Sequence, residues 1–212
     1  MEWYEWEPFY EEILREFGFS REKDRKAAEA AIKIAKSTIS VEDLKNIIKG
    51  RIVSVCGAGE NLEDEMEEVE GTIIAADEAT SILLKHKIIP HIITTDLDGN
   101  VGDIIRANEK GCIVIIHAHG DNMEALKKYL PLFHKKIMLT TQEKAFNGIY
   151  NFGGFTDGDR AYCIASHFEA RKIKLIGFDF EKPREKEGKN RDIKLKKLEW
   201  AKKIIEYEMA KK

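Results

Sequence analysis

Residues 51–59 read RIVSVCGAG, a short apolar run that ends in a Gly-Ala-Gly turn. Similar runs, rich in apolar and β-branched residues, recur at 72–76, 92–95, 112–117, 137–140 and 174–178. Helical segments are expected between and after the first four runs, near 61–69, 79–87, 101–109 and 122–130. Runs that are apolar throughout indicate strands covered on both faces. Their alternation with helices predicts an α/β protein with a doubly wound, mostly parallel, Rossmann-like sheet.

The first 50 residues precede this alternation and predict three helices. Capping residues indicate that the second helix covers about 20–36 and the third about 40–50. We therefore divide the chain into an N-terminal helical segment, 1–50, and an α/β domain, 51–212.

The first predicted helix carries Trp6, Tyr10, Ile13 and Phe17 on one face. A contiguous face of this kind is too apolar to be left in water. Either the rest of the chain or a second copy of the protein has to cover it. We favour a homodimer that also uses this segment, because soluble enzymes of this size often form twofold pairs.

The 212 residues include 35 basic and 38 acidic side chains, for a net charge of -3. This balance argues against nucleic-acid binding, which usually needs a basic surface. No apolar run is long enough to cross a membrane, and the acidic N-terminus does not resemble a secretory signal. A cytoplasmic protein with no membrane partner is therefore expected. The three cysteines are far apart, and Cys56 and Cys112, which lie in apolar runs, are assigned to core packing. Abundant Lys and Glu with a single Gln are typical of heat-adapted proteins.

Acidic side chains recur where the predicted strands end, at the edge of a parallel sheet where ligands bind. Asp96 and Asp98 flank Leu97, and in an extended segment two residues so spaced point the same way. Two converging carboxylates repel each other, and a divalent cation, for which Mg²⁺ is the best fit, removes that repulsion. Asp77 and Asp121 follow neighbouring strands, where each either joins the same ions or caps a helix. The predicted metal ligands are Asp77, Asp96, Asp98 and Asp121.

Gly57, Ala58 and Gly59 lie between a predicted strand and a predicted helix. The pattern fits either anion binding at a helix N-terminus or a tight turn, and it lacks the third glycine of the dinucleotide fingerprint. His117 and His119 alternate after a later strand, but no further residue has the spacing of a zinc ligand. Contact with phosphate, or a role in shaping the turn, is favoured for the two histidines.

Residues 151–160 read NFGGFTDGDR and suit either a substrate-binding loop or an ordinary loop that caps a helix at about 160–171. In the first interpretation two phenylalanines enclose a flat ring, aspartates accept hydrogen bonds from a guanidine-like edge, and basic side chains contact phosphate. The predicted substrate-binding residues are Phe152, Phe155, Thr156, Asp157 and Asp159, and the predicted phosphate contacts are Arg160 and Lys144. The basic stretch at 182–197 is either a solvated surface or a flexible lid over the phosphates.

Five segments, in this order, resemble the archaeal 6-hydroxymethyl-7,8-dihydropterin pyrophosphokinase family: CGAG at 56–59, ADEAT at 76–80, TTDLDG at 94–99, HAHGDN at 117–122 and GGFTDGDR at 153–160. The catalytic domain of that family is similar to that of thiamine pyrophosphokinases. The resemblance implies Mg²⁺-dependent transfer of diphosphate from ATP to the hydroxymethyl oxygen of the dihydropterin, with release of AMP. Such a step depends on positioning and charge neutralisation more than on covalent chemistry.

The resemblance also implies roles for single residues. The places of the acids that assemble Mg²⁺ and ATP in the thiamine enzymes are occupied by Asp77, then Asp96 with Asp98, then Asp121 with Glu124. The residues assigned to ATP are Gly57, Ala58, Gly59, Asp77, Lys144 and Arg160, and those assigned to catalysis are Asp96, Asp98, Asp121 and His119. Either Asp121 or His119 would act as the general base. The sequence departs from the thiamine enzymes at Thr95, where they have glycine, and at Gly99, where they have serine.

Three other functions are weighed against this one. A thiamine pyrophosphokinase-like activity is disfavoured because residues 191–210 predict a helix where those enzymes carry a β-sandwich that helps to bind thiamine. A nucleotide-sugar glycosyltransferase is the alternative enzyme, because a related domain occurs in motility-associated glycosyltransferases. A non-enzymatic nucleotide-binding module would keep the glycine turn but would have little use for converging carboxylates.

Overall fold

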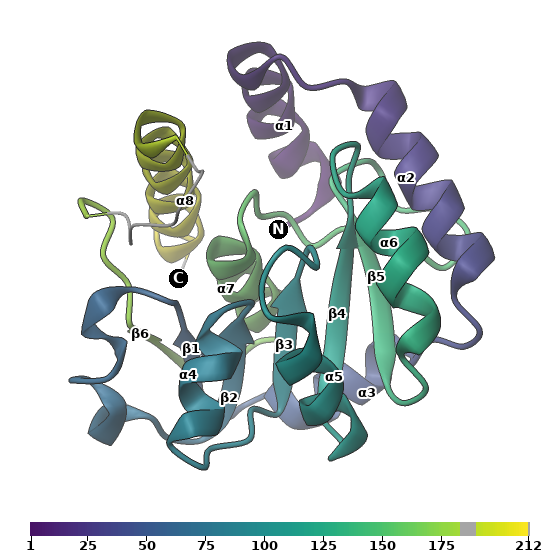
Figure 1. Ribbon diagram of the computed structural model, residues 1–212. Coiled ribbons are helices and arrows are strands. Elements are labelled where there is room, and N and C mark those ends of the chain that lie inside the picture. Colours follow the sequence, from purple (N-terminus) through teal and green to yellow (C-terminus); the bar gives the residue numbers. More distant parts are fainter. Residues whose placement is uncertain (183–189, 212) are drawn as a thin grey trace.

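The computed structural model describes residues 1–182 and 190–211. Within them, six strands form one sheet in the order β5-β4-β3-β2-β1-β6, and every neighbouring pair is parallel (Figure 1). The strands are β1 Ile52–Cys56, β2 Thr72–Ala76, β3 Ile92–Thr95, β4 Ile113–Ala118, β5 Ile137–Thr141 and β6 Lys172–Ile176. The predicted doubly wound parallel sheet is confirmed, and each predicted strand lies within two residues of its observed position.

Helices cover both faces of the sheet, which is what makes it doubly wound (Figure 1). One face packs against α2 (Arg21–Ile34), α4 (Ala79–Lys85), α5 (Val101–Glu109) and α6 (Met123–Tyr129). The other face packs against α3 (Val41–Ile48) and α7 (Asp157–His167).

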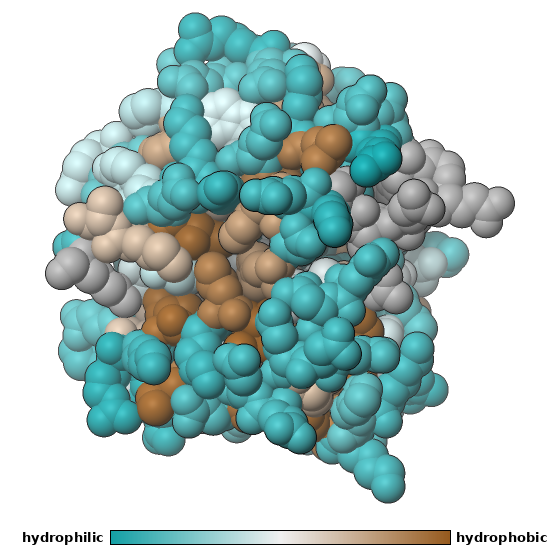
Figure 2. Space-filling view, turned by 90° about the vertical axis from the view of Figure 1, so that its left-hand side faces the viewer, coloured by the Kyte–Doolittle hydropathy of each residue, from teal (hydrophilic) through white to brown (hydrophobic). Residues whose placement is uncertain are grey.

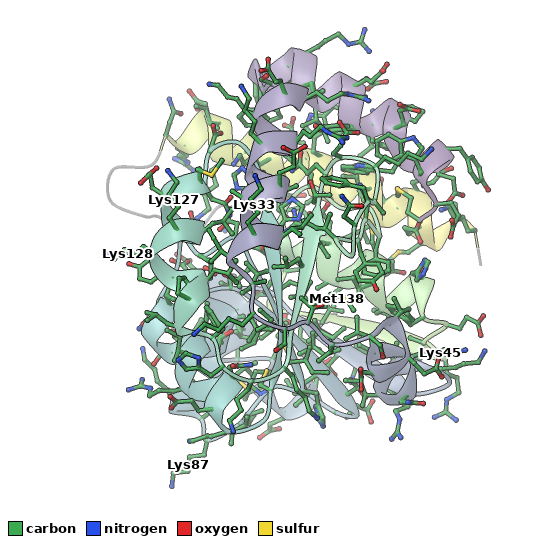
Figure 3. The ribbon with its side chains drawn as sticks, turned by 90° about the vertical axis from the view of Figure 1, so that its right-hand side faces the viewer. Lys33, Lys45, Lys87, Lys127, Lys128 and Met138 are labelled. Carbon is green, nitrogen blue, oxygen red and sulfur yellow. The ribbon has the colours of Figure 1, made fainter. Side chains whose placement is uncertain are left out.

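The helices are amphipathic, and their apolar faces set this arrangement. In α2, Ala27 and Ala31 are fully buried against the sheet layer, whereas Lys33 is exposed. Figure 3 shows the same division on this side of the molecule: Lys33 and Lys127 project outward from α2 and α6, and Met138 of β5 lies buried inside. The burial of such apolar faces is the main stabilising contribution to the fold.

The α-helix predicted near 61–69 does not form. The segment instead contains two short 3-10 turns, η1 (Glu60–Leu62) and η2 (Met66–Glu68). Two of its side chains form hydrogen bonds just after the end of β6. Glu65 Oε2 accepts from Gly177 N at 2.7 Å, and Asn61 Nδ2 donates to the Phe178 carbonyl at 3.4 Å. These contacts between distant parts of the chain, together with crowded acidic side chains, outweigh local helix formation.

The N-terminal helix α1 (Trp3–Phe17) packs on the same chain, against the loop after β5 and against α8 (Arg191–Met209). Trp6, Tyr10 and Ile13 have no exposed surface. Trp6 Nε1 donates to the Gln142 carbonyl at 2.9 Å, and Trp200 Nε1 of α8 donates to a Glu16 carboxylate oxygen at 2.8 Å. The apolar stripe is therefore covered within one chain. None of the helices in the described residues has the length and apolar character needed to cross a membrane.

Candidate active site

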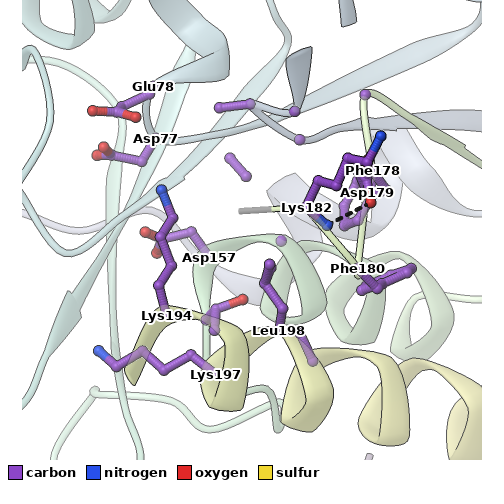
Figure 4. A pocket seen from close by; sticks show the side chains of 18 of the residues that line it. Asp77, Glu78, Asp157, Phe178, Asp179, Phe180, Lys182, Lys194, Lys197 and Leu198 are labelled. Atoms are coloured by element: carbon purple, nitrogen blue, oxygen red, sulfur yellow. Dashed lines mark hydrogen bonds between the residues drawn. The ribbon is translucent and has the colours of Figure 1, made fainter. Parts of the chain in front are cut away.

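A cavity of about 410 Å³ opens at the carboxyl ends of β1, β2 and β6, and α8 forms its facing wall (Figure 4). Its main lining residues are Gly57, Ala58, Gly59, Asp77, Glu78, Asp98, Thr156, Asp157, Gly158, Phe178, Phe180, Lys194, Lys197 and Leu198. Acidic side chains stand at the sheet edge, and lysines reach in from α8. In Figure 2, on the side of the molecule where β6 and α8 lie, apolar side chains gather in the centre and polar ones surround them.

Three carboxylates converge at the edge of the sheet, and two of them, Asp77 and Asp157, line this cavity. Asp77 follows β2, Asp96 follows β3, and Asp157 opens α7, and one carboxylate oxygen of each lies within 4.8 Å of the others. Two threonines of β3 form hydrogen bonds to Asp157 and Asp77. Thr94 Oγ1 donates to the Asp157 carbonyl at 2.9 Å, and Thr95 Oγ1 donates to the Asp77 carboxylate. We call Asp77, Asp96 and Asp157 the acid trio.

The backbone after β3 explains why Asp98 is not part of the acid trio. Leu97 has a φ of 68°, in the left-handed region, so the segment is not extended and the expected alignment of Asp96 with Asp98 does not form. Asp98 N instead donates to Asp96 Oδ1 at 3.2 Å. Leu97 is turned inward, with 2% of its surface exposed, and Asp98 lies exposed on the cavity wall.

Burial and mutual repulsion raise the pKa values of two of these acids. Burial, with the nearby charges of Asp96 and Asp98, raises the pKa of Asp77 to about 7 against a hydrogen bond from Thr95 that lowers it. Burial and the charge of Asp96 likewise raise the pKa of Asp157 well above its usual range, although Arg160 works against the shift.

Asp96 shifts in the opposite direction. Burial acts to raise its pKa, but the hydrogen bond from His119 and the charges of His119 and Arg160 outweigh burial, so the pKa of Asp96 lies well below its usual range. His119 Nε2 is 3.4 Å from Asp96 Oδ2. The surroundings therefore favour the charged form of Asp96 and disfavour the charged forms of Asp77 and Asp157.

The acid trio fits a divalent cation. Asp77 Oδ2 is buried and has no hydrogen-bond partner among the described residues, a costly state for a carboxylate oxygen. A cation that accepts oxygen ligands would satisfy this atom and remove the repulsion that raises the pKa values. Carboxylate oxygens without nitrogen or sulfur donors suit Mg²⁺ rather than zinc. Asp77, Asp96 and Asp157 are the residues able to hold it.

The glycine turn lines the cavity, but two of its amide groups are already paired. Gly57 N donates to the Ile176 carbonyl and Gly59 N to the Gly177 carbonyl, each at 2.8 Å. A Cβ on Gly57 would lie 2.7 Å from the Gly177 oxygen, so the glycine permits close packing of two loops. The segment forms the tight turn that was the other interpretation: the N–H groups of Gly57 and Gly59 face β6, and a 3-10 turn follows in place of an α-helix.

The side chains of Asp159 and Arg160 are buried and form hydrogen bonds within the protein. Asp159 is fully buried and accepts hydrogen bonds from Phe155 N at 2.6 Å and Thr156 N at 2.7 Å, which completes a capping box at the start of α7. Arg160 is 3% exposed; it donates to Asp157 Oδ1 at 2.8 Å and to the Phe155 carbonyl at 3.0 Å. Asp159 thus caps the helix, and Arg160 braces the acid trio and does not line the cavity.

The two phenylalanines predicted to enclose a ring lie in different hydrophobic clusters. Phe152 packs with Tyr150 and Phe168 beneath the sheet, and Phe155 packs with Phe17 against the N-terminal segment. Both are buried, and neither lines the cavity. The ring sandwich is therefore wrong, since both side chains serve the core.

The remaining predicted residues lie around the site. His117 is buried, its Nδ1 lies 3.1 Å from Thr140 Oγ1, and its Nε2 has no partner within the described part of the chain. Asp121 and Lys144 are exposed on loops, outside both the acid trio and the cavity lining. Among the described residues the acid trio contains carboxylates alone, although His119 Nε2 lies 3.4 Å from Asp96 Oδ2.

The individual residues of α8 that line the cavity were not predicted from the sequence. Lys194, Lys197 and Leu198 line the cavity, and in Figure 4 the Lys194 side chain extends toward Asp77 and Asp157. The basic composition of 182–197 was the available signal. The lid interpretation falls largely on 183–189, which lie outside the described residues. Phe178 and Phe180 follow β6 and carried no local signal that separates them from core aromatics.

Comparison with known proteins adds independent findings. The model of the family described as 6-hydroxymethylpterin diphosphokinase MptE-like matches residues 27–185. The chain is 41% identical to the 6-hydroxymethyl-7,8-dihydropterin pyrophosphokinase of Methanocaldococcus jannaschii, over 98% of this chain and 95% of that protein. It is 42% identical to the protein of the same name from Pyrococcus furiosus, over 98% of this chain and 94% of the relative.

A solved structure is also similar. The MAf glycosyltransferase from Magnetospirillum magneticum matches with a TM-score of 0.49 and 16% identity, over 85% of this chain and 35% of that one.

Proposed function

The chain belongs to the 6-hydroxymethylpterin diphosphokinase MptE-like family, and from this premise we propose that it transfers diphosphate from ATP to 6-hydroxymethyl-7,8-dihydropterin. In this reaction the hydroxymethyl oxygen forms a bond to the β-phosphorus of ATP. The bond between that phosphorus and the oxygen bridging to the α-phosphorus breaks, and AMP leaves. The observation that carries the proposal is one cavity lined by Asp77 and Asp157 of the acid trio and, from α8, by Lys194 and Lys197.

The acid trio is the proposed Mg²⁺ site. When bound, the ion neutralises phosphate oxygens and polarises the β-phosphorus. Asp77, Asp96 and Asp157 supply its carboxylate ligands, and Arg160 keeps Asp157 in place through their 2.8 Å ion pair. Asp98 and Glu78 also line the cavity, and their charges act on Asp77, so we propose that they contact the ion through water.

The opposite wall is the proposed phosphate and base site. Lys194 and Lys197 bring positive charge to a polyphosphate that the carboxylates alone would repel. Gly57, Ala58 and Gly59 offer a surface free of side chains larger than methyl, so a flat group can approach the backbone. Phe178 and Phe180 form an apolar, aromatic end of the cavity that suits the adenine ring.

The hydroxymethyl proton needs an acceptor. We propose His119 for this role: its Nε2 lies 3.4 Å from Asp96 Oδ2 and its Nδ1 accepts a hydrogen bond from Asp121 N at 3.4 Å, so one ring nitrogen has to exchange its present partner for the hydroxymethyl group. Asp121, the other sequence-based choice for the base, is exposed and lies outside the acid trio.

We retain two further sequence-based proposals: a cytoplasmic location and a homodimer. The apolar stripe of α1 is buried within the chain, so a dimer has to use another surface. Light scattering of the purified protein measures the mass directly, and a mass near 24.3 kDa would contradict the dimer.

Nucleotide product analysis tests the reaction. The protein is incubated with ATP, Mg²⁺ and 6-hydroxymethyl-7,8-dihydropterin, and AMP is expected in equal amounts with the pterin diphosphate. ADP with a monophosphorylated pterin would contradict the proposal. Thiamine in place of the pterin is expected to react poorly. Turnover of a nucleotide sugar without pterin turnover would support the glycosyltransferase alternative instead.

A further inference from the structure

A buried carboxylate outside the α/β domain connects the N-terminal segment to the turn after β4. Asp24 of α2 has 4% of its surface exposed. Its Oδ1 accepts a hydrogen bond from Gly120 N at 2.7 Å, and its Oδ2 accepts one from the Tyr10 hydroxyl at 2.6 Å. Asp24 therefore ties α1 and α2 to a single backbone amide of this turn, and both oxygens are used.

The same turn carries His119 to the acid trio. Asn122 fixes the inner side of the turn: its Nδ2 donates to the Asp96 carbonyl at 2.8 Å and the His117 carbonyl at 2.7 Å, and its Oδ1 accepts from His119 N at 3.1 Å. The outer side is held by Asp24. His119 lies between these two attachments, with its Nε2 3.4 Å from Asp96 Oδ2.

The fit between α2 and the turn is close. A Cβ on Gly120 would lie 2.6 Å from the Cβ of Lys23 and 3.4 Å from Asp24 Oδ1. The turn thus touches α2 through bare backbone, and a small displacement of either would alter the path of residues 119–122. A carboxylate is well suited here because it accepts two hydrogen bonds in a buried position, and charge-assisted bonds are the stronger kind.

We propose that Asp24 is a positioning residue for the reaction: by holding the Gly120 amide, its carboxylate keeps His119 beside Asp96. The inference rests on the proposed function, since the place of His119 matters to turnover only if the acid trio is the reaction centre. Asp24 and Tyr10 precede residue 27, where the family match begins, so neither role follows from that match.

Three variants isolate this role. Asp24→Ala removes the acceptor of Gly120 N, whereas Asp24→Asn keeps one acceptor oxygen for Gly120 N and loses the charge and the acceptor of the Tyr10 hydroxyl. Thr72→Val is the control for lost stability, because it removes a buried hydrogen bond to the Ile47 carbonyl at the opposite edge of the sheet. We expect Asp24→Ala to lower kcat about 10- to 100-fold with the KM for ATP changed less than about threefold, and Asp24→Asn to recover most of this loss.

A measurement without substrate or metal separates the structural link from the chemistry. Exchange of the Gly120 amide hydrogen, followed by NMR, is expected to speed up in Asp24→Ala and to remain slow in Thr72→Val. Faster exchange with a kcat equal to that of Thr72→Val would overturn the positioning role. If the wild-type protein does not turn over the pterin, the proposed function fails, and the exchange data still report whether Asp24 holds the turn.

A steric variant keeps the inference testable if Asp24→Ala does not fold. Gly120→Ala pushes the turn away from Lys23 without removing a buried group and is expected to lower kcat about 10-fold or more. Lys23→Gly removes the opposing Cβ on the exposed surface of α2, and the double variant is expected to regain most of the lost kcat. Full activity of Gly120→Ala, or no recovery in the double variant, would contradict the inference.

Discussion

Gly99 lies against the carboxylate of Asp77 so closely that a Cβ at residue 99 would overlap Asp77 Oδ2. The two residues come from neighbouring loops, after β3 and β2. On the other side of the carboxylate, Thr95 donates a hydrogen bond to Oδ1. The bare backbone of Gly99 is thus part of the wall that sets the position of Asp77 in the acid trio. It also accounts for glycine in place of the serine of the thiamine enzymes, because a serine here would displace this carboxylate.

A side chain at position 99 is therefore expected to destroy the metal site. Gly99→Ser should abolish Mg²⁺-dependent turnover and lower the free energy of unfolding by about 1–3 kcal/mol, the usual cost of overpacking. Gly102→Ala is the matched control, because its Cβ would meet only Asn100 Oδ1 at 3.4 Å. Activity assays and urea unfolding measure both effects. A fully active Gly99→Ser variant would show that Asp77 does not need this position.

Removal of one acid trio carboxylate should abolish activity without unfolding the protein. Asp96→Asn and Asp157→Asn are each expected to lower turnover at least about 100-fold, because each removes a charged ligand. The melting temperature of Asp157→Asn should be unchanged or raised, since repulsion between the carboxylates is relieved. That of Asp96→Asn should fall, because His119 and Arg160 stabilise the charged form of Asp96. Asp121→Asn, on an exposed turn outside the acid trio, should stay within about threefold of wild type. If Asp121→Asn lost turnover and Asp157→Asn kept it, the metal ligands would be those predicted from the sequence, with Asp121 in place of Asp157.

Mg²⁺ should stabilise the protein more at high pH than at low pH. Burial and neighbouring charges raise the pKa of Asp77 from 3.8 to about 7, so the folded protein binds more protons than the unfolded chain between these values. Stability without metal therefore falls as pH rises through this range. Because the ion binds the deprotonated acids, the rise in melting temperature on adding Mg²⁺ should be larger at about pH 8 than at about pH 5. A larger rise at low pH would contradict the metal assignment.

The lysines of α8 should contribute to nucleotide binding. Lys194→Ala and Lys197→Ala are each expected to raise the KM for ATP about 10-fold, the effect of losing a charge-assisted contact to phosphate. Lys202→Ala, on the same helix and outside the cavity lining, is the control and should leave the KM unchanged. Steady-state kinetics at saturating pterin distinguish these outcomes, and equal KM values for all three variants would remove α8 from the nucleotide site.

The aromatic face of α1 should contribute stability within one chain. Trp6→Ala is expected to lower the free energy of unfolding by about 3–5 kcal/mol, because Trp6 is fully buried and its Nε1 is hydrogen-bonded. Tyr4→Ala, at a site that is 75% exposed, should change it by less than about 0.5 kcal/mol. Denaturant unfolding measures both. If Trp6→Ala kept its stability and changed only the mass seen by light scattering, the stripe would be an interface after all.

Local patterns were sufficient for the elements of the fold. The apolar runs predicted six strands, because residues covered on both faces must all be apolar. The capping residues Ser20 and Ser40 predicted the starts of α2 and α3, because a cap bonds amides only two or three residues away. The same logic applies to Thr156 and Asp159, whose spacing is that of a capping box and would have identified Asp159 as structural.

The sequence by itself determined that acids would gather at the carboxyl edge of a parallel sheet, since the parallel direction of the strands follows from their alternation with helices. Which acids meet was decided by the tertiary structure. Leu97 in the left-handed region turns Asp98 away, and packing of α7 on β3 brings Asp157 beside Asp77. The physical reason is that the direction of a side chain at the end of a strand depends on the local backbone angles and on the packing of neighbouring loops. The spacing of residues along the chain determines neither of them.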